Sequence, residues 1–548
     1  MNIFNYITQP RIQRNRFDLG HEVKMSMRPG FLTPILLEET IPGDKFFINS
    51  EVLIRFAPML APIMHRVNVY THFYFVPYRL LWDEFELFIT GGPDGQAMPE
   101  FPRIQYSPGA MDSYLHEGGL ADYLKLPTYN RGATNSPYGA GDTFNALPFR
   151  AYQLIYNEFY RDQNLQDPVV INKTSGVDPS WAALMELRRR NWEKDYFTSS
   201  LPWTQRGGDV TIPTKGNAAI VHKQDPSIPG LELTDQLIFP SGAQPNTDPN
   251  YMQTLQSAPG VYNPAHIGTF DQITGNFSGP AQIDVSRWEV DLQNAAAVTI
   301  NELRRASRLQ EWLERNARGG ARYIEQILSH FGVTSSDARL QRPEYLGGGR
   351  TPIRISEVLQ TAPWSVDSQG QETTPLAEMA GHGIGTGNSN RVTKYCEEHG
   401  FVIGLMSIMP RSAYQQGMPR LYRKYDKFDY YYPEFAHLGE QEVYNREIYK
   451  ANDALDDAVF GYQSRYVEYK QSPSRVHGYM KSSLDFWHLG RKFATRPVLN
   501  SEFVKMEEEV FDRVFAVVED ENAQNFYVHL YNAVQAIRPM PMFATPSF

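Results

Sequence analysis

The chain has 548 residues, of which 41% are hydrophobic and 21% charged; these values are typical of globular proteins and exclude a disordered chain. Its 32 Tyr, 31 Phe and 38 Pro favour strands and turns over helices. The single cysteine, Cys396, excludes an intrachain disulfide and a cysteine-rich zinc site. The net charge of -10 argues against a protein that coats nucleic acid through general electrostatics.

No segment predicts export or membrane insertion. The N-terminus lacks the apolar core of a signal peptide. The longest apolar run, FVIGLMSIMP from Phe401, is about half of the roughly 20 residues that a membrane helix requires. We therefore expect a soluble protein that folds in a reducing cytoplasm.

Residues 1–45 are predicted to form a partly basic N-terminal arm. Within residues 1–30, five basic residues accompany two acidic ones, a net charge of +3, and neither helical nor strand periodicity is evident. Two interpretations are open for Arg11, Arg14 and Arg16. They make a weak contact with nucleic acid, or the arm lies across a neighbouring subunit.

Residues 46–56 and 65–77 are predicted to be strands, because both are rich in Val, Ile, Phe and Tyr and are bounded by prolines. In the second strand, alternation places an apolar face toward the core and gathers the polar and aromatic side chains on the other face. That face consists of Arg66, Asn68, Tyr70, His72 and Tyr74. It is a candidate packing or subunit-contact surface.

The two histidines of this region invite a metal hypothesis, which the strand assignment weakens. His65 and His72 are seven residues apart, and an odd separation on a strand puts side chains on opposite faces. We therefore expect no metal pair here. His65 is interpreted as a strand-end contact.

Helices are predicted to be few and short. The clearest begins with capping-box spacing at Thr299 and Glu302, carries an apolar stripe of helical period and ends at a Gly pair. A second helix covers residues 321–331. Two further candidates begin at Pro148 and Trp181.

Residues 207–298 differ in texture from the rest of the chain. These 92 residues hold nine Pro, nine Gly and a net charge of -6, without a sustained helical period. Such a segment inside a folded chain is usually a functional surface excursion. We predict an inserted subdomain or spike rather than a free linker, because the segment contains too many apolar residues for a free coil.

Strand signals return toward the C-terminus, at residues 401–410, 464–471, 513–520 and 525–537. Strands thus occur at both ends of the sequence, with long excursions between them. This pattern is typical of a β-sandwich decorated by large loops.

The sequence offers no convincing catalytic or metal-binding motif. HEVKM at His21 and HEGGL at His116 lack the second histidine of a zincin, and YLGGGR at Tyr345 lacks the Lys-Ser/Thr pair of a phosphate loop. We expect no catalytic residues, no cofactor and no metal, and hence no enzyme. The alternative is a carbohydrate-binding or carbohydrate-active β-sandwich, for which Asp429 and Glu434 could be drawn as a carboxylate pair.

Several blocks in a fixed order carry a resemblance to a known family. They include RNRFDLGHEVKMSM, RFAPMLAPIMHRVNVYTHFYFVPYRLLW, LPFRAYQLIYNEFYRDQN, AGHGIGTGNSN, FDYYYPEFAHLGEQEVYN, SRVHGYMKSSLDFWHLGR and RPMPMFATPSF. The chain resembles the major capsid protein of gokushovirus-type Microviridae, small icosahedral phages with circular single-stranded DNA. The resemblance runs from about Asn15 to the C-terminus and leaves out residues 207–298.

This resemblance implies a viral jelly roll, an eight-stranded antiparallel sandwich with long inserted loops and a few short helices. Residues 46–206 would hold its first part, and residues 299–548 a helical excursion, the remaining strands and the tail. The implied product is a T=1 icosahedral shell built from pentamers and assembled in the bacterial host cytoplasm. An insertion at the position of residues 207–298 forms threefold protrusions in the family and implies host attachment.

The resemblance also implies partners. These are further copies of the chain, an internal scaffolding protein, a small basic DNA-binding virion protein, the single-stranded DNA genome and a host cell-surface receptor. Because Tyr and Trp dominate interface hot spots, the weak candidates for subunit contact are Tyr430, Tyr431, Tyr432, Trp487 and His72. Simple core packing is an equally good interpretation of the tyrosine segment.

Overall fold

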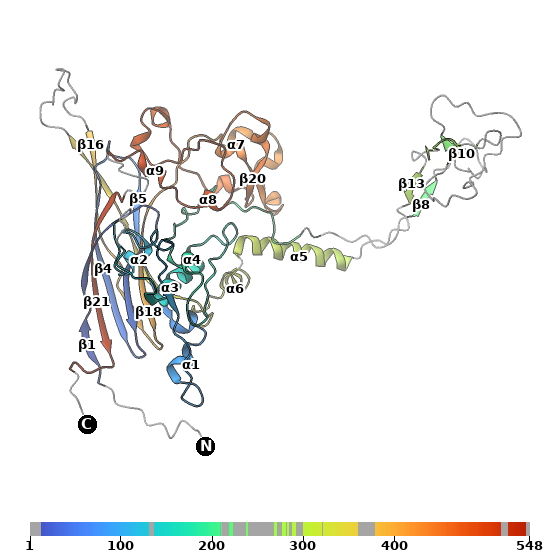
Figure 1. The fold of residues 1–548 in the computed structure, drawn as a ribbon. Coiled ribbons are helices and arrows are strands. Elements are labelled where there is room, and N and C mark those ends of the chain that lie inside the picture. Colours follow the sequence, from blue (N-terminus) through green and yellow to red (C-terminus); the bar gives the residue numbers. More distant parts are fainter. Residues whose placement is uncertain are drawn as a thin grey trace, which may run out of the picture. The chain divides into compact units, whose positions relative to one another are not determined.

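The computed structural model describes residues 13–130, 136–208, 210, 300–320, 322–359, 379–516 and 524–543, together with short strands between residues 219 and 291. The chain divides into two compact units, Met1–Arg206 with Leu313–Phe548, and Gly207–Trp312. Arg11, Thr299 and most of the 207–298 segment lie outside the described residues. The described fold is mainly β, as predicted, with antiparallel sheets and short helices (Figure 1).

Seven strands form the larger sheet of the first unit. They are β1 (Asn15–Asp18), β2 (His21–Met27), β4 (Lys45–Phe56), β15 (Arg354–Leu359), β16 (Met379–Asn388), β17 (Val392–Tyr395) and β21 (Phe526–Arg538). The order is β1-β21-β4-β16-β15, with β2 also paired to β21 and β17 also paired to β4. β4 and β21 confirm the strands predicted at residues 46–56 and 525–537.

Four strands form the second sheet. They are β3 (Thr33–Thr40), β5 (Val67–Pro77), β14 (Glu344–Pro352) and β18 (Gly400–Pro410). Their order is β14-β5-β18-β3, so β5 and β18 are the central pair. Both were predicted as strands. With seven strands in one sheet and four in the other, the two sheets hold eleven described strands where eight were expected.

The N-terminal region requires a correction. Within the stretch of residues 1–45 that was expected to form an arm, β1, β2 and β3 are built into the two sheets. β1 and β2 both pair with β21, which follows them by about 500 positions in the sequence. Their pairing partner is too distant along the chain for local periodicity to indicate it.

The two sheets pack around one hydrophobic core. In β4 and β21 alternate side chains point inward, and the buried ones from both sheets form a single cluster. Phe56 of β4 and Phe526 of β21 meet edge to face, with ring centroids 4.6 Å apart. The alternation that identified these strands in the sequence therefore also builds the core.

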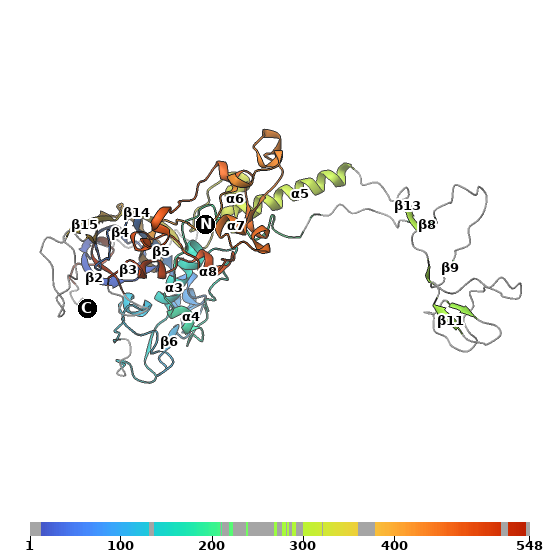
Figure 2. The same cartoon turned by 90° about the horizontal axis from the view of Figure 1, so that it is seen from above.

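β5 is buried on both faces. Val67, Val69 and Phe73 belong to the core between the sheets, whereas Tyr74 packs into a second cluster formed with residues 82–187. This excursion covers the outer face of the four-stranded sheet (Figures 1 and 2). Apart from Arg66, which is exposed and precedes β5, the polar face predicted for this strand is thus an internal packing surface.

The excursion that follows β5 contains short helices and a small hairpin. These elements are α1 (Phe85–Thr90), β6 (Arg103–Gln105), α2 (Leu120–Tyr123), β7 (Thr143–Asn145), α3 (Leu147–Ile155) and α4 (Trp181–Met185). α3 confirms the helix predicted from Pro148 and continues as a π-turn, Tyr156–Tyr160. The helix predicted from Trp181 ends early, because the backbone after Met185 bridges to Phe31 at Arg189 and to Lys505 at Asn191.

A second excursion connects β18 to β21. Its elements are β19 (Gln441–Tyr444), α7 (Asn445–Ile448), β20 (Val459–Gln463), α8 (Ser501–Val504) and α9 (Glu509–Asp512). The strand predicted from Ser464 is wrong, since Tyr466 adopts a left-handed conformation (φ 60°) and begins a 3-10 helix, Val467–Tyr469. The strand predicted from Arg513 is also wrong for its described part, which is a turn after α9.

Two helices follow the 207–298 segment and confirm the predicted pair. They are α5 (Ile300–Gly319) and α6 (Tyr323–Phe331), and Gly332 ends the second in a left-handed conformation (φ 68°). Within the unit Gly207–Trp312 the described strands form three antiparallel ladders. One pairs β8 (Ala219–His222) with β13 (Trp288–Asp291), and the others pair β9 (Leu237–Ile238) with β12 (Gln282–Ile283) and β10 (Gly268–Phe270) with β11 (Phe277–Pro280).

Candidate assembly surfaces

The tyrosine segment predicted as an interface is exposed in this chain. Tyr430, Tyr431 and Tyr432 lie between two 3-10 turns, and their exposed fractions are 50%, 54% and 54%. They line an open groove of about 850 Å³, which we call the tyrosine groove. The remaining lining residues are Ala436, His437, Arg465, Tyr466, Tyr469 and Lys470.

Polar contacts under the tyrosine groove hold its aromatic rings in place. The buried Tyr466 donates its hydroxyl to the Phe428 carbonyl (3.0 Å), and its backbone N–H donates to Gln441 Oε1 (2.8 Å). The Tyr431 ring meets the Tyr466 ring edge to face at 5.4 Å. The exposed rings therefore stand on a fixed base and lose little conformational freedom on contact with a partner.

The cations at the tyrosine groove are engaged within the chain. Arg465 donates to the Phe428 carbonyl (3.2 Å), and Lys470 donates to the Arg465 carbonyl (3.0 Å). Lys424 lies over the Tyr469 ring at 3.9 Å and pairs with Glu468 at 3.1 Å. The groove consequently presents mainly aromatic surface to a partner.

Trp487 is not part of this groove. It lies half-buried in a 3-10 turn, Asp485–Trp487, where its carbonyl accepts from the Met64 N–H (2.8 Å). The structure thus does not bring Trp487 together with the tyrosines that the sequence grouped with it.

His72 lies in an aromatic cluster inside the chain. Its Nδ1 is 2.7 Å from the Tyr160 hydroxyl, and its ring meets Tyr345 edge to face at 5.8 Å. Burial and the nearby Arg190 lower the pKa of His72 to about 4, so the ring is neutral at neutral pH. Of the two roles proposed for this face, packing within the chain is the one that these contacts show.

His65 is a strand-end contact, as interpreted from the sequence. Its Nε2 lies 2.5 Å from the Arg411 carbonyl, and burial lowers its pKa to about 4. Among the residues that the structure describes, no group of three or more His, Cys, Asp or Glu side chains is placed to hold a metal ion. No described helix is long and apolar enough to cross a membrane.

Part of the predicted basic arm, from residue 13 onward, lies among the residues that the structure describes. Arg14 and Arg16 are both exposed, and Arg16 hydrogen-bonds Gln535. Arg16 belongs to β1 and opposes Ile537 of β21, so it lies on the outer face of the seven-stranded sheet. Neither view shows a helix over this face (Figures 1 and 2).

This outer sheet face is basic although the whole chain is acidic. Strand register places six basic residues on it against three acidic ones, a net charge of +3. The basic residues are Arg16, Lys24, Lys45, Arg55, Arg354 and Arg391, and the acidic ones are Asp18, Glu22 and Glu51. Exposed tyrosines, Tyr395, Tyr527 and Tyr531, stand among them. Sequence reasoning missed this surface because its residues come from six separate strands.

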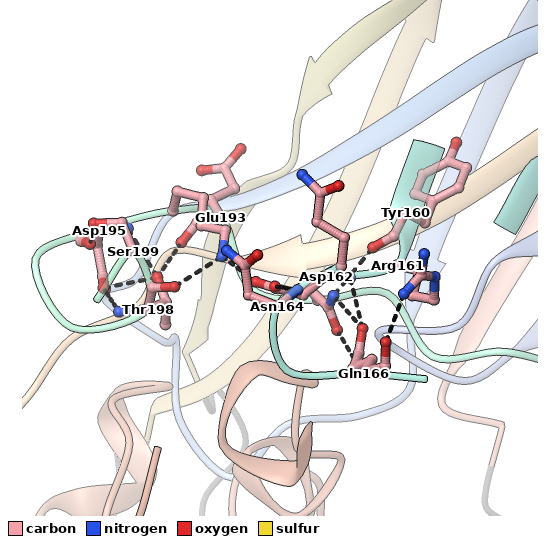
Figure 3. Close-up of polar contacts among 12 residues, drawn as sticks. Tyr160, Arg161, Asp162, Asn164, Gln166, Glu193, Asp195, Thr198 and Ser199 are labelled. Carbon is pink, nitrogen blue, oxygen red and sulfur yellow. Dashed lines mark hydrogen bonds and ion pairs between the residues drawn. The ribbon is translucent and has the colours of Figure 1, made fainter. Parts of the chain in front are cut away.

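A polar network holds the end of the first excursion together (Figure 3), and Asp195 extends it to the start of the second. Asp195 accepts from the backbone N–H groups of Phe197 (3.0 Å) and Thr198 (2.8 Å) and from the Tyr414 hydroxyl (2.8 Å). Asp162 pairs with Lys194. The Asp-x-x-Thr spacing was a local turn signal, but its partner Tyr414 was not visible from the sequence.

Comparison with known proteins identifies the family of the chain that carries these surfaces. The capsid protein (F protein) family model matches residues 6–548. The chain belongs to this capsid protein family. It is 35% identical to capsid protein VP1 of Chlamydia phage 1 over 100% of this chain and 97% of the relative. It is 34% identical to capsid protein VP1 of Bdellovibrio phage phiMH2K over 92% of this chain and 90% of that relative.

A third relative, capsid protein VP1 of Spiroplasma virus 4, is 30% identical over 99% of this chain and 97% of its own length. The resemblance to the major capsid protein of gokushovirus-type Microviridae is therefore confirmed. As a member of the capsid family, the chain is a structural protein of the virion that assembles with copies of itself into a shell, and it is not an enzyme.

Proposed function

We propose that the sandwich is a viral jelly roll and forms the tile of a T=1 icosahedral shell around a circular single-stranded DNA genome. The strand order carries this proposal. β1 and β2 act as one interrupted strand beside β21, and β16 and β17 as another beside β4. If each interrupted strand is counted once and β15 is treated as an extra edge strand, each sheet has four strands. Two four-stranded sheets are the arrangement of a double Greek key.

Assembly requires contacts between different surfaces of neighbouring copies, because a closed shell is built from repeated heterologous interfaces. The tyrosine groove supports this role, since rigid exposed tyrosines are enriched at interface hot spots. Many weak contacts suffice, because closure is multivalent. Pentamers, and an internal scaffolding protein acting in the bacterial cytoplasm, belong to this proposal.

Genome contact is proposed for the outer sheet face and the basic residues Arg11, Arg14 and Arg16. Single-stranded nucleic acid is bound by cations that track its backbone and by aromatic rings on which bases stack, and this face offers both. A chain with a net charge of -10 cannot neutralise a packed genome alone. A small basic virion protein is therefore part of the proposal.

The genome contact is tested with the double substitution Arg14→Ser and Arg16→Ser. We expect weaker binding of a single-stranded oligonucleotide and a log–log salt dependence that is shallower by about 2, one per lost phosphate contact. Arg308→Ser, which removes an exposed arginine of α5, is the matched control. Equal salt dependence in all three proteins would reject the face as a DNA contact.

The shell itself is tested by electron microscopy of the purified chain. Uniform small icosahedra are expected. A monodisperse monomer with glycosidase turnover would overturn the proposal in favour of the carbohydrate-active alternative.

A further inference from the structure

We infer that the tyrosine groove receives the apolar C-terminal segment of a second copy of this chain. This inference rests on assembly into a shell and names the partner of the tyrosine groove. The segment is residues 539–543, with the sequence Pro-Met-Pro-Met-Phe, and we call it the tail segment. Its last two described side chains are largely exposed, Met542 at 57% and Phe543 at 82%.

The start of the tail segment is held by hydrogen bonds, and its last residues are exposed. Arg538 donates to the Glu39 carbonyl (2.8 Å), and Asn15 Nδ2 donates to the Met540 carbonyl (2.8 Å). After this anchor, Pro541, Met542 and Phe543 are exposed. A run of exposed apolar residues leaving a well-packed sheet indicates a contact with another molecule.

The groove of the same chain does not hold this segment. The excursion that builds the groove leaves the sandwich after Pro410 and returns at Phe526, where β21 begins. β21 then runs 13 residues to Arg538, which at about 3.4 Å per step is roughly 41 Å from Phe526 along the strand. Figure 1 shows α7 and β20 beside one end of the sandwich and the end of β21 at the other. The occupant must come from another copy.

The chemistry of the two surfaces matches. Proline-rich segments favour an extended conformation without internal hydrogen bonds and dock into grooves lined by aromatic rings. Methionine thioethers also make favourable contacts with aromatic rings. The groove offers five tyrosines, Tyr430, Tyr431, Tyr432, Tyr466 and Tyr469. The tail segment offers two prolines, two methionines and one phenylalanine, and no charge.

The groove favours this occupant over nucleic acid. Arg465 and Lys470 donate hydrogen bonds to backbone carbonyls, and Lys424 is paired with Glu468. Phosphates would therefore compete with existing contacts, whereas apolar side chains can pack on the exposed parts of the tyrosine rings. Docking of one tail per groove is a head-to-tail contact, the type that can repeat around a closed shell.

The inference is tested by fluorescence anisotropy with a labelled peptide of residues 539–548 and the full-length, unassembled chain. Saturable binding is expected, at least tenfold weaker for a peptide with Met542→Ser and Phe543→Ser. A chain with Tyr431→Ser and Tyr469→Ser should bind at least tenfold more weakly than the wild type. Both tyrosines are exposed, so folding should survive their replacement. Tyr479→Ser, at an exposed tyrosine outside the groove, is the matched control and should bind like the wild type.

Shell yield is the second measurement. Full-length chains with Met542→Ser and Phe543→Ser should form fewer shells. A circular dichroism spectrum like that of the wild type would show that assembly rather than folding is affected. Three results would each overturn the inference while leaving the capsid function intact. The peptide does not bind, the tyrosine substitutions do not weaken its binding, or the shell yield is unchanged. A single-stranded oligonucleotide that requires Tyr431 and Tyr469 and displaces the peptide would also overturn it, assigning the groove to nucleic acid.

Discussion

At the scale of single residues, a buried ion pair secures the first excursion. Arg150 of α3 and Asp178 are both fully buried, with the guanidinium donating to the carboxylate at 2.7 and 2.9 Å and to the carbonyls of Leu81 and Thr174 at 3.1 Å. Arg150→Met leaves the carboxylate buried without its partner. We expect the free energy of unfolding to fall by about 3–5 kcal/mol, measured by denaturant titration.

Two controls separate the lost partner from the lost side chain. Asp178→Asn added to Arg150→Met removes the unpaired charge while the side chain still accepts from Ser180, so part of the loss should be recovered. Arg308→Met breaks an exposed pair with Glu311 and should cost at most about 1 kcal/mol. Equal effects of Arg150→Met and Arg308→Met would contradict the argument.

Two histidines make the fold sensitive to acid. Burial lowers the pKa values of His65 and His72 to about 4 from an ordinary value of 6.5, so the unfolded chain binds protons that the folded chain does not. Their stabilising contribution is complete above about pH 6.5 and is lost as the pH falls toward 4. Between pH 7 and 5, each of the two histidines should lower the free energy of unfolding by about 1–2 kcal/mol.

The measurement is the unfolding midpoint as a function of pH for the wild type and His72→Gln. The variant should be less stable at pH 7, because it loses the contact with Tyr160, yet its midpoint should fall less on acidification. Parallel pH profiles of the two proteins would show that His72 does not titrate as argued.

At the scale of elements, β18 is the most constrained strand. It lies between β5 and β3, and all of its residues are buried. Gly404 leaves room for its neighbours, since a Cβ there would lie 2.9 Å from the Phe73 ring and 3.0 Å from Leu36 Cβ. Gly404→Ala should therefore lower the free energy of unfolding by about 1–3 kcal/mol through overpacking, as measured by denaturant titration.

Gly139→Ala is the control for this substitution. The nearest atoms to a Cβ at Gly139 belong to Asp142 and lie 3.8 Å or more away, and its backbone is not left-handed. Its stability should match the wild type. A Gly404→Ala protein as stable as Gly139→Ala would show that Phe73 and Leu36 give way to the added methyl group more easily than their packing indicates.

At the scale of the whole molecule, the 207–298 segment should be dispensable for shell formation. β8 and β13 pair in register from Ala219–Asp291 to His222–Trp288, so the two ends of the segment meet. Replacing residues 223–287 by Asn-Gly should close these strands as a two-residue hairpin. We expect shells at wild-type yield, counted by electron microscopy, with reduced adsorption to host cells.

Adsorption and assembly must be measured on the same preparation. Normal shells with normal adsorption would remove the segment from host attachment. Soluble chain without shells would show instead that the segment is needed for assembly.

Much of the framework was predictable from the sequence. Alternation and β-branched or aromatic composition are local signals, and they identified β4, β5, β18 and most of β21. Capping spacing and glycine stops likewise identified α5 and α6. Long sequence blocks in a fixed order indicated the capsid family, which the comparisons confirm. The sequence left the tyrosines at 430–432 open between an interface and core packing, and the structure shows them half-exposed.

Tertiary structure alone decided how these parts meet. The second buried face of β5 depends on an excursion that folds back over it, and β1 and β2 depend on a strand at the other end of the chain. The groove joins Tyr431 to Tyr466 and Tyr469 through ring contacts, and hydrogen bonds to Phe428 and Gln441 hold Tyr466 in place. Hydrophobic alternation is a property of neighbouring residues, and the sequence therefore shows it directly. The contacts of the groove and of β1 and β2 bring together residues that are tens to hundreds of positions apart, and no local pattern predicts them.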